Sequence, residues 1–165
     1  LQYLIEAFKH IQTEKKLVIA GGSSDSDDFM KQVQNMAAGD SRIIFTGFVQ
    51  GQMLDELYSN AYIYCLPSDL EGMPLSLLEA MSYGNCCLTS DIAECAEVVE
   101  DKAALFQKGN VASLQEKLDE LCQHPERVNQ YKKGAADFIC NKYSWDDVVK
   151  TTLEVYQRLE TNKRK

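Results

Sequence analysis

The sequence predicts an α/β fold: a Rossmann-like parallel sheet with helices on both faces, followed by extra helices at the C-terminal end. Short apolar runs of strand length alternate with segments whose apolar residues recur at helical spacing. Within these runs the residues are apolar throughout, which is typical of parallel strands buried on both faces. A chain of 165 residues, 45% of them hydrophobic, is long enough for one sizeable core. We therefore expect a single domain.

The elements of the first half are predicted from these strand-length apolar runs and from the apolar residues at helical spacing. The apolar residues of Leu1 to Ile11 recur at helical spacing, so the chain is expected to begin inside a helix. Glycines close the first two strands, and Pro67 closes the third. The predicted strands are Leu17 to Ala20, Arg42 to Thr46 and Tyr62 to Leu66, separated by helices around Phe29 to Met36 and Met53 to Tyr58.

The second half continues this alternation and then becomes helical. Pro74 can start a helix without the loss of a hydrogen bond, and Gly84 suits its end. The elements expected next are a strand from Cys86 to Thr89, a short helix from Glu94 to Val99 and a strand from Ala103 to Phe106. The remaining third reads as three helices, which run from Asn110 to Leu121, from Pro125 to Phe138 and from Ser144 to Leu159.

Charge and cysteine content narrow the function classes. The formal net charge of −8 speaks against a nucleic-acid groove or an anionic membrane surface, because both need a basic patch. The six cysteines form no Cys-x-x-Cys pair and there are only two histidines, so no metal site is predicted. The sequence shows no signal peptide and no apolar span of about 20 residues. Cysteines inside apolar runs fit a reducing compartment, so we expect a cytoplasmic protein.

The stretch from Pro67 to Gly84 holds the candidate site. It reads as strand, turn and helix, and the first backbone N–H groups of a helix can hold an anion such as phosphate. Glu71 lies in the turn and Glu79 lies eight positions later in the helix, so the two cannot serve one bond as acid and base. Two separated carboxylates with amides between them suit a ligand with hydroxyls at both ends and phosphates in the middle. A nucleotide sugar has this layout.

Spacing alone leaves plainer interpretations open. Glu71 could be an acid favoured by the helix dipole, and Glu79 a solvated helix position. Each glycine loop could likewise be a simple turn. Ligands of open α/β sheets bind beyond the carboxyl ends of the strands, so the four loops together favour one cleft for a phosphorylated molecule. These loops are Gly21-Gly22, Gly47 to Val49, Pro67 to Met73 and Ser90-Asp91.

The segment from Glu71 to Gly84 resembles the E-x7-E signature of the retaining glycosyltransferases with the two-domain GT-B fold. The resemblance is to the large family 4, also called glycosyltransferase group 1, and it covers nearly the whole chain. Further segments similar to the family are Leu1 to Phe8, Leu17 to Gly22, Ile43 to Val49, Pro67-Ser68, Glu97 to Val99 and Ser144-Trp145. Residues 1–165 would then form the donor-binding C-terminal half of such a GT-B enzyme.

The resemblance implies transfer of a sugar from a nucleotide-diphosphate sugar to an acceptor, with retention of anomeric configuration. Glu71, as the catalytic residue, would contact hydroxyls of the donor sugar, and Glu79 would hold the ribose hydroxyls. The backbone around Val49 would contact the base. The other residues implied to line the donor site are Gly21, Gly22, Gly47, Gly72, Met73, Pro74 and Leu75.

The same resemblance implies the partners. The donor would be a UDP-, GDP- or other NDP-sugar, and no metal or cofactor is implied, because helix amides and basic side chains take the role of a cation. The acceptor, a glycan, a lipid or another molecule, would bind through a missing N-terminal domain. The full-length enzyme could also associate peripherally with a membrane. No nucleic-acid partner is expected.

Three departures from the family pattern limit the implied activity. The family's arginine and lysine that grip the diphosphate would precede Leu1, and so would a central strand between those at Leu17 and Tyr62. After Asp91, where the family often has two glycines, this chain has Ala93 and Glu94, whose side chains narrow the approach to the sugar. We therefore expect a truncated fragment that binds the donor weakly and does not turn over.

Other classes fit the residues less well. A non-catalytic nucleotide-sugar-binding or sensor module of the same fold stays open, although both acids are present. A Rossmann oxidoreductase would need Gly-x-Gly-x-x-Gly after the first strand, and Gly21-Gly22 does not continue that way. A sugar-nucleotide epimerase would need a histidine in the cleft, whereas His10 and His124 lie in or beside predicted helices.

Overall fold

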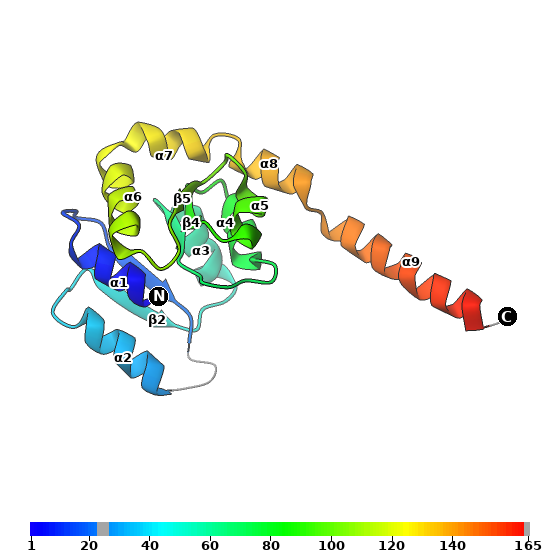
Figure 1. The fold of residues 1–165 in the computed structure, drawn as a ribbon, viewed down its shortest axis with the longest axis horizontal. Coiled ribbons are helices and arrows are strands. Elements are labelled where there is room, and N and C mark those ends of the chain that lie inside the picture. Colours follow the sequence, from blue (N-terminus) through cyan, green and yellow to red (C-terminus); the bar gives the residue numbers. More distant parts are fainter. Residues whose placement is uncertain (23–26, 164–165) are drawn as a thin grey trace.

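A computed structural model describes residues 1–22 and 27–163 of the chain (Figure 1). Strands and helices alternate up to β5, and only helices follow it, as the sequence predicts. In chain order the elements are α1 (Gln2–Lys9), β1 (Leu17–Ala20), α2 (Asp27–Ala37), β2 (Ile43–Gly47), α3 (Gln52–Asn60), β3 (Tyr64–Leu66), α4 (Leu75–Ser82), β4 (Cys87–Ser90), α5 (Ala93–Val99), β5 (Ala104–Phe106), α6 (Val111–Gln123), α7 (Pro125–Lys132), α8 (Ala135–Lys142) and α9 (Trp145–Lys163).

All strand pairs in the described residues are parallel, but the strands form two sheets. In one sheet β1 pairs with β2, and in the other β4 lies between β3 and β5. The strands β1 and β3 are not paired with each other. The sequence analysis expects a further strand at this position, between the strands at Leu17 and Tyr62.

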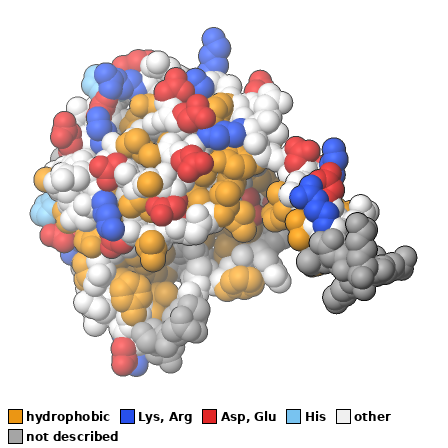
Figure 2. All heavy atoms as spheres, turned by 45° about the vertical axis from the view of Figure 1, so that its right-hand side comes forward, with side chains coloured by type: hydrophobic (Ala, Val, Ile, Leu, Met, Phe, Trp, Pro, Cys, Tyr) orange, Lys and Arg blue, Asp and Glu red, His pale blue; other side chains and the backbone are white. Residues whose placement is uncertain are grey.

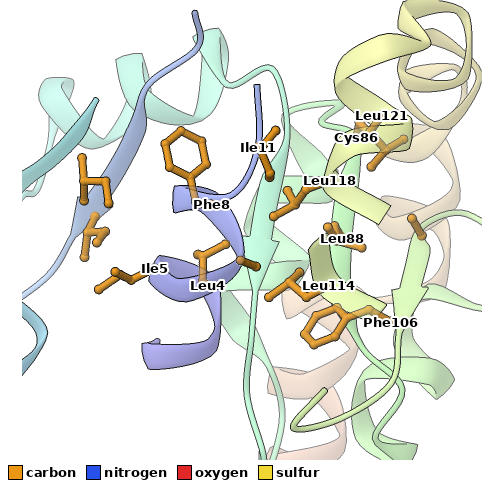
Figure 3. Packing of buried hydrophobic residues seen from close by; sticks show 14 of the residues in the cluster. Leu4, Ile5, Phe8, Ile11, Cys86, Leu88, Phe106, Leu114, Leu118 and Leu121 are labelled. Carbon is orange, nitrogen blue, oxygen red and sulfur yellow. The ribbon is translucent and has the colours of Figure 1, made fainter. Parts of the chain in front are cut away.

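Helices cover both faces of the three-stranded sheet. Along β4, Leu88 belongs to one buried cluster and Cys87 to another, because successive side chains of a strand point to opposite faces. The first cluster joins β4 to α1 and α6, and it also takes in Ile19 and Ile43 of the other sheet. Figure 3 shows Leu4, Ile5 and Phe8 of α1 and Leu114 and Leu118 of α6 within it. The second cluster packs α3, α4, α5 and α8 on the opposite face.

The structure corrects the helix that the sequence analysis expects from Pro125 to Phe138. The helix breaks after Lys132, and α7 and α8 follow each other as separate helices (Figure 1). Lys133 is extended, and Gly134 has a φ of 82°, a conformation that favours glycine. The break redirects the chain, so that Val128 joins the first cluster and Ile139 the second.

The last helix, α9, extends away from the rest of the molecule (Figure 1). Its apolar side chains from Trp145 to Tyr156 are exposed, with Trp145 at 72% and Tyr156 at 61%. The sequence predicts this helix, from Ser144 to Leu159. Across the part of the chain that the structure describes, no helix is both long and apolar enough to span a membrane.

Candidate functional site

The glycine loops that follow β1 and β2 lie against each other. The Gly21 N–H donates a hydrogen bond of 2.9 Å to the Gly47 carbonyl oxygen. A Cβ added to Gly22 would stand 3.9 Å from the Cβ of Phe48. Gly21 and Gly47 have φ values of 140° and 70°, a range that L side chains rarely adopt. Two of the four predicted loops therefore form one continuous backbone surface.

The loops that follow β3 and β4 form a second such pair. The Ser90 hydroxyl donates a hydrogen bond of 2.5 Å to the Ser68 carbonyl oxygen, and Ser90 is 1% exposed. At the β5 side of the same edge, the Asp91 carboxylate accepts a hydrogen bond of 2.8 Å from the Lys108 N–H. The turn that carries Glu71 is thereby tied to the central strand of the three-stranded sheet.

Glu71 is half-buried in this turn and has a side-chain donor of its own. The Ser68 hydroxyl donates a hydrogen bond of 2.6 Å to Glu71 Oε1. Burial raises the pKa of the Cys95 thiol, and the charge of Glu71 raises it further. The charge of Glu71 therefore acts on α5, the helix that begins with Ala93 and Glu94.

At the start of α4, one of the first backbone N–H groups of the helix is not free to hold an anion. The Leu75 N–H donates a hydrogen bond of 2.8 Å to the Met73 carbonyl oxygen. Pro74, with φ −77° and ψ 74°, is the central residue of this inverse γ-turn. A ligand oxygen must therefore displace the Met73 carbonyl to reach the Leu75 amide. Pro74 is buried, whereas Gly72 and the side chains of Met73 and Leu75 are exposed.

Glu79 lies in α4, and its side chain is exposed. The Tyr58 hydroxyl, from the C-terminal end of α3, donates a hydrogen bond of 3.1 Å to Glu79 Oε2. Burial, and after it Glu79, raise the pKa of Tyr58, so this phenol stays protonated and keeps its donor. The two acids thus have different neighbours: Glu71 faces Ser68 and α5, and Glu79 faces α3.

The structure brings the predicted site residues together in two groups. One contains Gly21, Gly22 and Gly47, with Val49 two positions after Gly47 in the chain, and the other contains Glu71 to Leu75 together with Glu79. No hydrogen bond recorded within residues 1–22 and 27–163 joins the glycine pair Gly21 and Gly47 to the Ser68 turn. The division follows the gap between β1 and β3.

A hollow of about 590 Å³ lies elsewhere, where α8 meets α9. Its lining includes Tyr143, Val148, Val155 and Tyr156, and its surface is mostly apolar. Figure 2 shows hydrophobic side chains at the surface beside this helix. The hollow exists because α9 leaves the body of the molecule, and it contains none of the residues predicted for the donor site.

The described residues contain no group of three or more His, Cys, Asp or Glu side chains that could hold a metal ion. His10 and His124 are both exposed, and the Nδ1 atom of His124 lies 2.9 Å from a Glu126 carboxylate oxygen.

Sequence reasoning missed Tyr58 and Ser68 as partners of the acids. Ser68 precedes Glu71 by three positions, a spacing at which a serine hydroxyl and a glutamate can meet in one turn, so a local signal was present. Tyr58 and Glu79 are separated by 21 positions in two different helices. No local pattern could have revealed that pair.

Residues 1–138 match the model of the protein family described as glycosyl transferases group 1. An uncharacterized glycosyltransferase of Methanocaldococcus jannaschii is 29% identical over 162 residues, which cover 95% of this chain and 41% of that protein. O-antigen chain mannosyltransferase B of Escherichia coli is 26% identical over 161 residues, which cover 94% of this chain and 42% of that protein. The chain thus spans less than half the length of these two relatives.

Solved structures share the fold of the chain. A glycosyltransferase from Rickettsia africae matches with a TM-score of 0.85 at 18% identity, covering 97% of this chain and 44% of that one. HepE of Anabaena in complex with UDP-glucose matches with a TM-score of 0.82 at 16% identity, covering 96% and 44%. Together with the strand pairing, these matches confirm the predicted α/β fold.

Proposed function

The chain belongs to the group 1 glycosyl transferases, and from this premise we propose that it is the donor-binding domain of a family 4 enzyme that retains the anomeric configuration of the transferred sugar. The observation that carries the proposal is the pair of acids around the start of α4. Glu71, in the turn, accepts a hydrogen bond from the Ser68 hydroxyl, and Glu79, in the helix, accepts one from the Tyr58 hydroxyl of α3. The acids are therefore oriented separately, as two contacts on one long ligand require.

The proposed ligand is a nucleotide-diphosphate sugar such as a UDP- or GDP-sugar. Glu71 contacts hydroxyls of the donor sugar, and Glu79 holds the ribose hydroxyls. Between them, the backbone from Gly72 to Leu75 and the positive end of α4 receive diphosphate oxygens without a metal ion. The Gly21–Gly47 backbone surface and the main chain at Val49 border the nucleotide. The Leu75 amide joins only if the γ-turn at Pro74 opens.

Names of relatives support the reaction and the ligand. The Escherichia coli relative is named a mannosyltransferase, and HepE was solved in complex with UDP-glucose. Buried free thiols such as Cys86, Cys87 and Cys95 support a reducing compartment, and we propose the cytoplasm. Membrane association of the full-length enzyme is proposed only as a peripheral contact.

We further propose that the complete enzyme has another half, which binds the acceptor, and a strand between β1 and β3. The two sheets share one core cluster although β1 and β3 are unpaired, which supports a missing central strand. Exposed apolar residues along α9, such as Trp145 and Tyr156, support a contact with the other half. The upstream reading frame tests this directly. We expect a domain of about 200 residues that ends with an arginine and a lysine before Leu1.

Donor binding by residues 1–165 can be tested by NMR titration with UDP, GDP and their glucose and mannose conjugates. We expect weak binding, with a Kd of about 1 mM, and chemical-shift changes at Gly21, Gly47 and the start of α4. Glu79→Gln should weaken binding of the nucleotide itself. Glu71→Gln should leave nucleotide binding unchanged and remove the further gain that the sugar moiety provides. Glu6→Gln, at an exposed position on α1, serves as the matched control.

Two outcomes of this titration would overturn the proposal. The absence of shifts up to about 10 mM of every ligand would exclude donor binding by this chain. Equal responses of the two variants would exclude the separate roles of the acids. Donor binding in a full-length protein without sugar transfer would instead identify the non-catalytic sensor module.

A further inference from the structure

Tyr58 is a buried residue whose side chain contacts the exposed side chain of Glu79. Its side chain is 9% exposed, and its hydroxyl donates a hydrogen bond of 3.1 Å to Glu79 Oε2. The Ser76 carbonyl oxygen stands farther away, at 3.5 Å from the same hydroxyl. A buried phenol therefore holds one oxygen of an exposed carboxylate.

The Tyr58 side chain is itself fixed from several directions. The Tyr83 ring stacks on it with centroids 5.3 Å apart and an interplanar angle of 24°. Tyr83 is held in turn, because its hydroxyl donates a hydrogen bond of 2.7 Å to Asp55 Oδ1. The Asn85 side chain, 2% exposed, donates a hydrogen bond of 2.9 Å to the Tyr58 carbonyl oxygen. The ring and the backbone of Tyr58 are thus both held in place by contacts other than the hydrogen bond to Glu79.

A long glutamate on a helix surface otherwise samples several rotamers, and ordering it on ligand binding costs side-chain entropy. A hydrogen bond from a fixed donor holds the glutamate side chain in one rotamer before the ligand binds. We propose that Tyr58 is the positioning residue of Glu79: it holds Oε2 so that the carboxylate meets the two vicinal hydroxyls of the ribose in one orientation. This inference rests on the proposed donor-binding function and extends it to a residue outside the E-x7-E segment.

The test uses Tyr58→Phe in the chain of residues 1–165, because phenylalanine keeps the ring that stacks on Tyr83. UDP and 2′,3′-dideoxy-UDP are titrated by NMR, or GDP and its dideoxy counterpart if the guanine nucleotide is the one that binds. We expect binding of the complete nucleotide to weaken about three- to tenfold. Binding of the dideoxy nucleotide should stay unchanged, because it has no ribose hydroxyls for Glu79 to hold.

Tyr64→Phe is the matched control. The Tyr64 hydroxyl also bonds to α4, donating a hydrogen bond of 2.8 Å to Ser76 Oγ, but it does not contact an acid. This variant should bind both nucleotides as the unsubstituted chain does. In the double variant Tyr58→Phe with Glu79→Gln, the loss should be no larger than that of Glu79→Gln alone, because the two residues act as one unit.

A second measurement needs no ligand. Since Glu79 raises the pKa of Tyr58, Glu79→Gln should lower that pKa, while the pKa of Tyr62, which burial raises, stays where it is. NMR of ring-labelled tyrosines follows both groups during a titration to high pH. If Glu79→Gln leaves the Tyr58 pKa unchanged, the hydrogen bond between Tyr58 and Glu79 is absent and the inference is overturned.

The binding outcomes separate the two proposals. Equal weakening of both nucleotides by Tyr58→Phe assigns Tyr58 a general structural role and overturns the inference. Unchanged binding of the complete nucleotide also overturns it, while leaving the donor-binding function in place. Failure of the unsubstituted chain to bind UDP or GDP overturns the donor-binding function, and this inference with it.

Discussion

At the scale of single residues, Ser68 gives Glu71 a fixed hydrogen-bond donor within its own turn. The Ser68 side chain bonds to Glu71 at 2.6 Å, and its carbonyl oxygen accepts the hydroxyl of the buried Ser90. A carboxylate held in this way loses less freedom when it binds a hydroxyl group. Glu71 is therefore oriented by β4, although its position in the sequence suggests only a loop.

The two acids should differ in their effects on turnover in the full-length enzyme. In the proposed site Glu71 contacts the sugar whose bond is broken, so at saturating donor Glu71→Gln should lower kcat about tenfold or more. Glu79→Gln should mainly raise KM, since the ribose lies far from the reacting atoms. Steady-state kinetics with a varied donor concentration checks this, with Glu6→Gln as the control. Small and equal effects on kcat would contradict the assignment of Glu71.

At the scale of elements, Arg42 joins the start of β2 to the end of α1. Its guanidinium donates hydrogen bonds of 2.7 Å to the Ile11 carbonyl oxygen and 3.1 Å to the Thr13 carbonyl oxygen. It also pairs with Asp40 at 2.7 Å. These carbonyl groups lie in the segment that follows α1. The contact fixes how α1 meets the two-stranded sheet.

This contact predicts a particular acid sensitivity. Hydrogen bonds from Arg42 lower the pKa of Asp40 from 3.8 to about 2. A lowered pKa in the folded state stabilises the fold above the ordinary pKa, and this contribution is lost as the pH falls from about 4 to about 2. The free energy of unfolding, measured in urea across this pH range, should fall less steeply for Asp40→Asn than for the unsubstituted chain.

Asp137→Asn, at an exposed carboxylate on α8, is the control for the acid series. It should leave the slope of stability against pH close to that of the unsubstituted chain. If Asp40→Asn and the unsubstituted chain decline in parallel between about pH 4 and 2, the Asp40–Arg42 pair does not act in the folded state as described.

At the scale of the whole molecule, the burial of the six free cysteines reflects how the core is packed. Cys86, Cys87 and Cys95 are fully buried, whereas Cys140 is exposed. Burial raises the pKa of Cys86 to about 12, which removes its reactive thiolate near neutral pH. The thiols on and beside the central strand β4 should therefore be inert in the folded state.

Alkylation by iodoacetamide under native conditions should modify Cys140 first, and the three buried thiols only after unfolding in urea. Mass spectrometry of digested samples identifies the modified residues, and Cys140→Ser should abolish the fast phase. Fast modification of Cys86 or Cys87 in the folded chain would contradict the central position of β4 and the packing of helices on both faces of its sheet.

The order of elements could be predicted because it rests on local patterns. Apolar runs such as Leu17 to Ala20 and the helical spacing of Leu4 and Phe8 are visible in short windows. The single helix expected after Pro125 was wrong, since helical spacing continues through residues 133 and 134 while the backbone turns at Gly134. Position along the sequence could not show how tertiary packing redirects α8 toward the second cluster.

Composition and spacing within a few residues encode the α/β alternation, the segment with both acids and the glycine loops, so these features could be read from the sequence. The donor that orients Glu79 and the contact that holds the Ser68 turn come from tertiary packing. Tyr58 meets Glu79 across two helices, and Ser90 reaches the Ser68 turn from a neighbouring strand. Such contacts join residues more than 20 positions apart, and no local period carries them. They depend on how α3, α4 and β4 pack around a shared core.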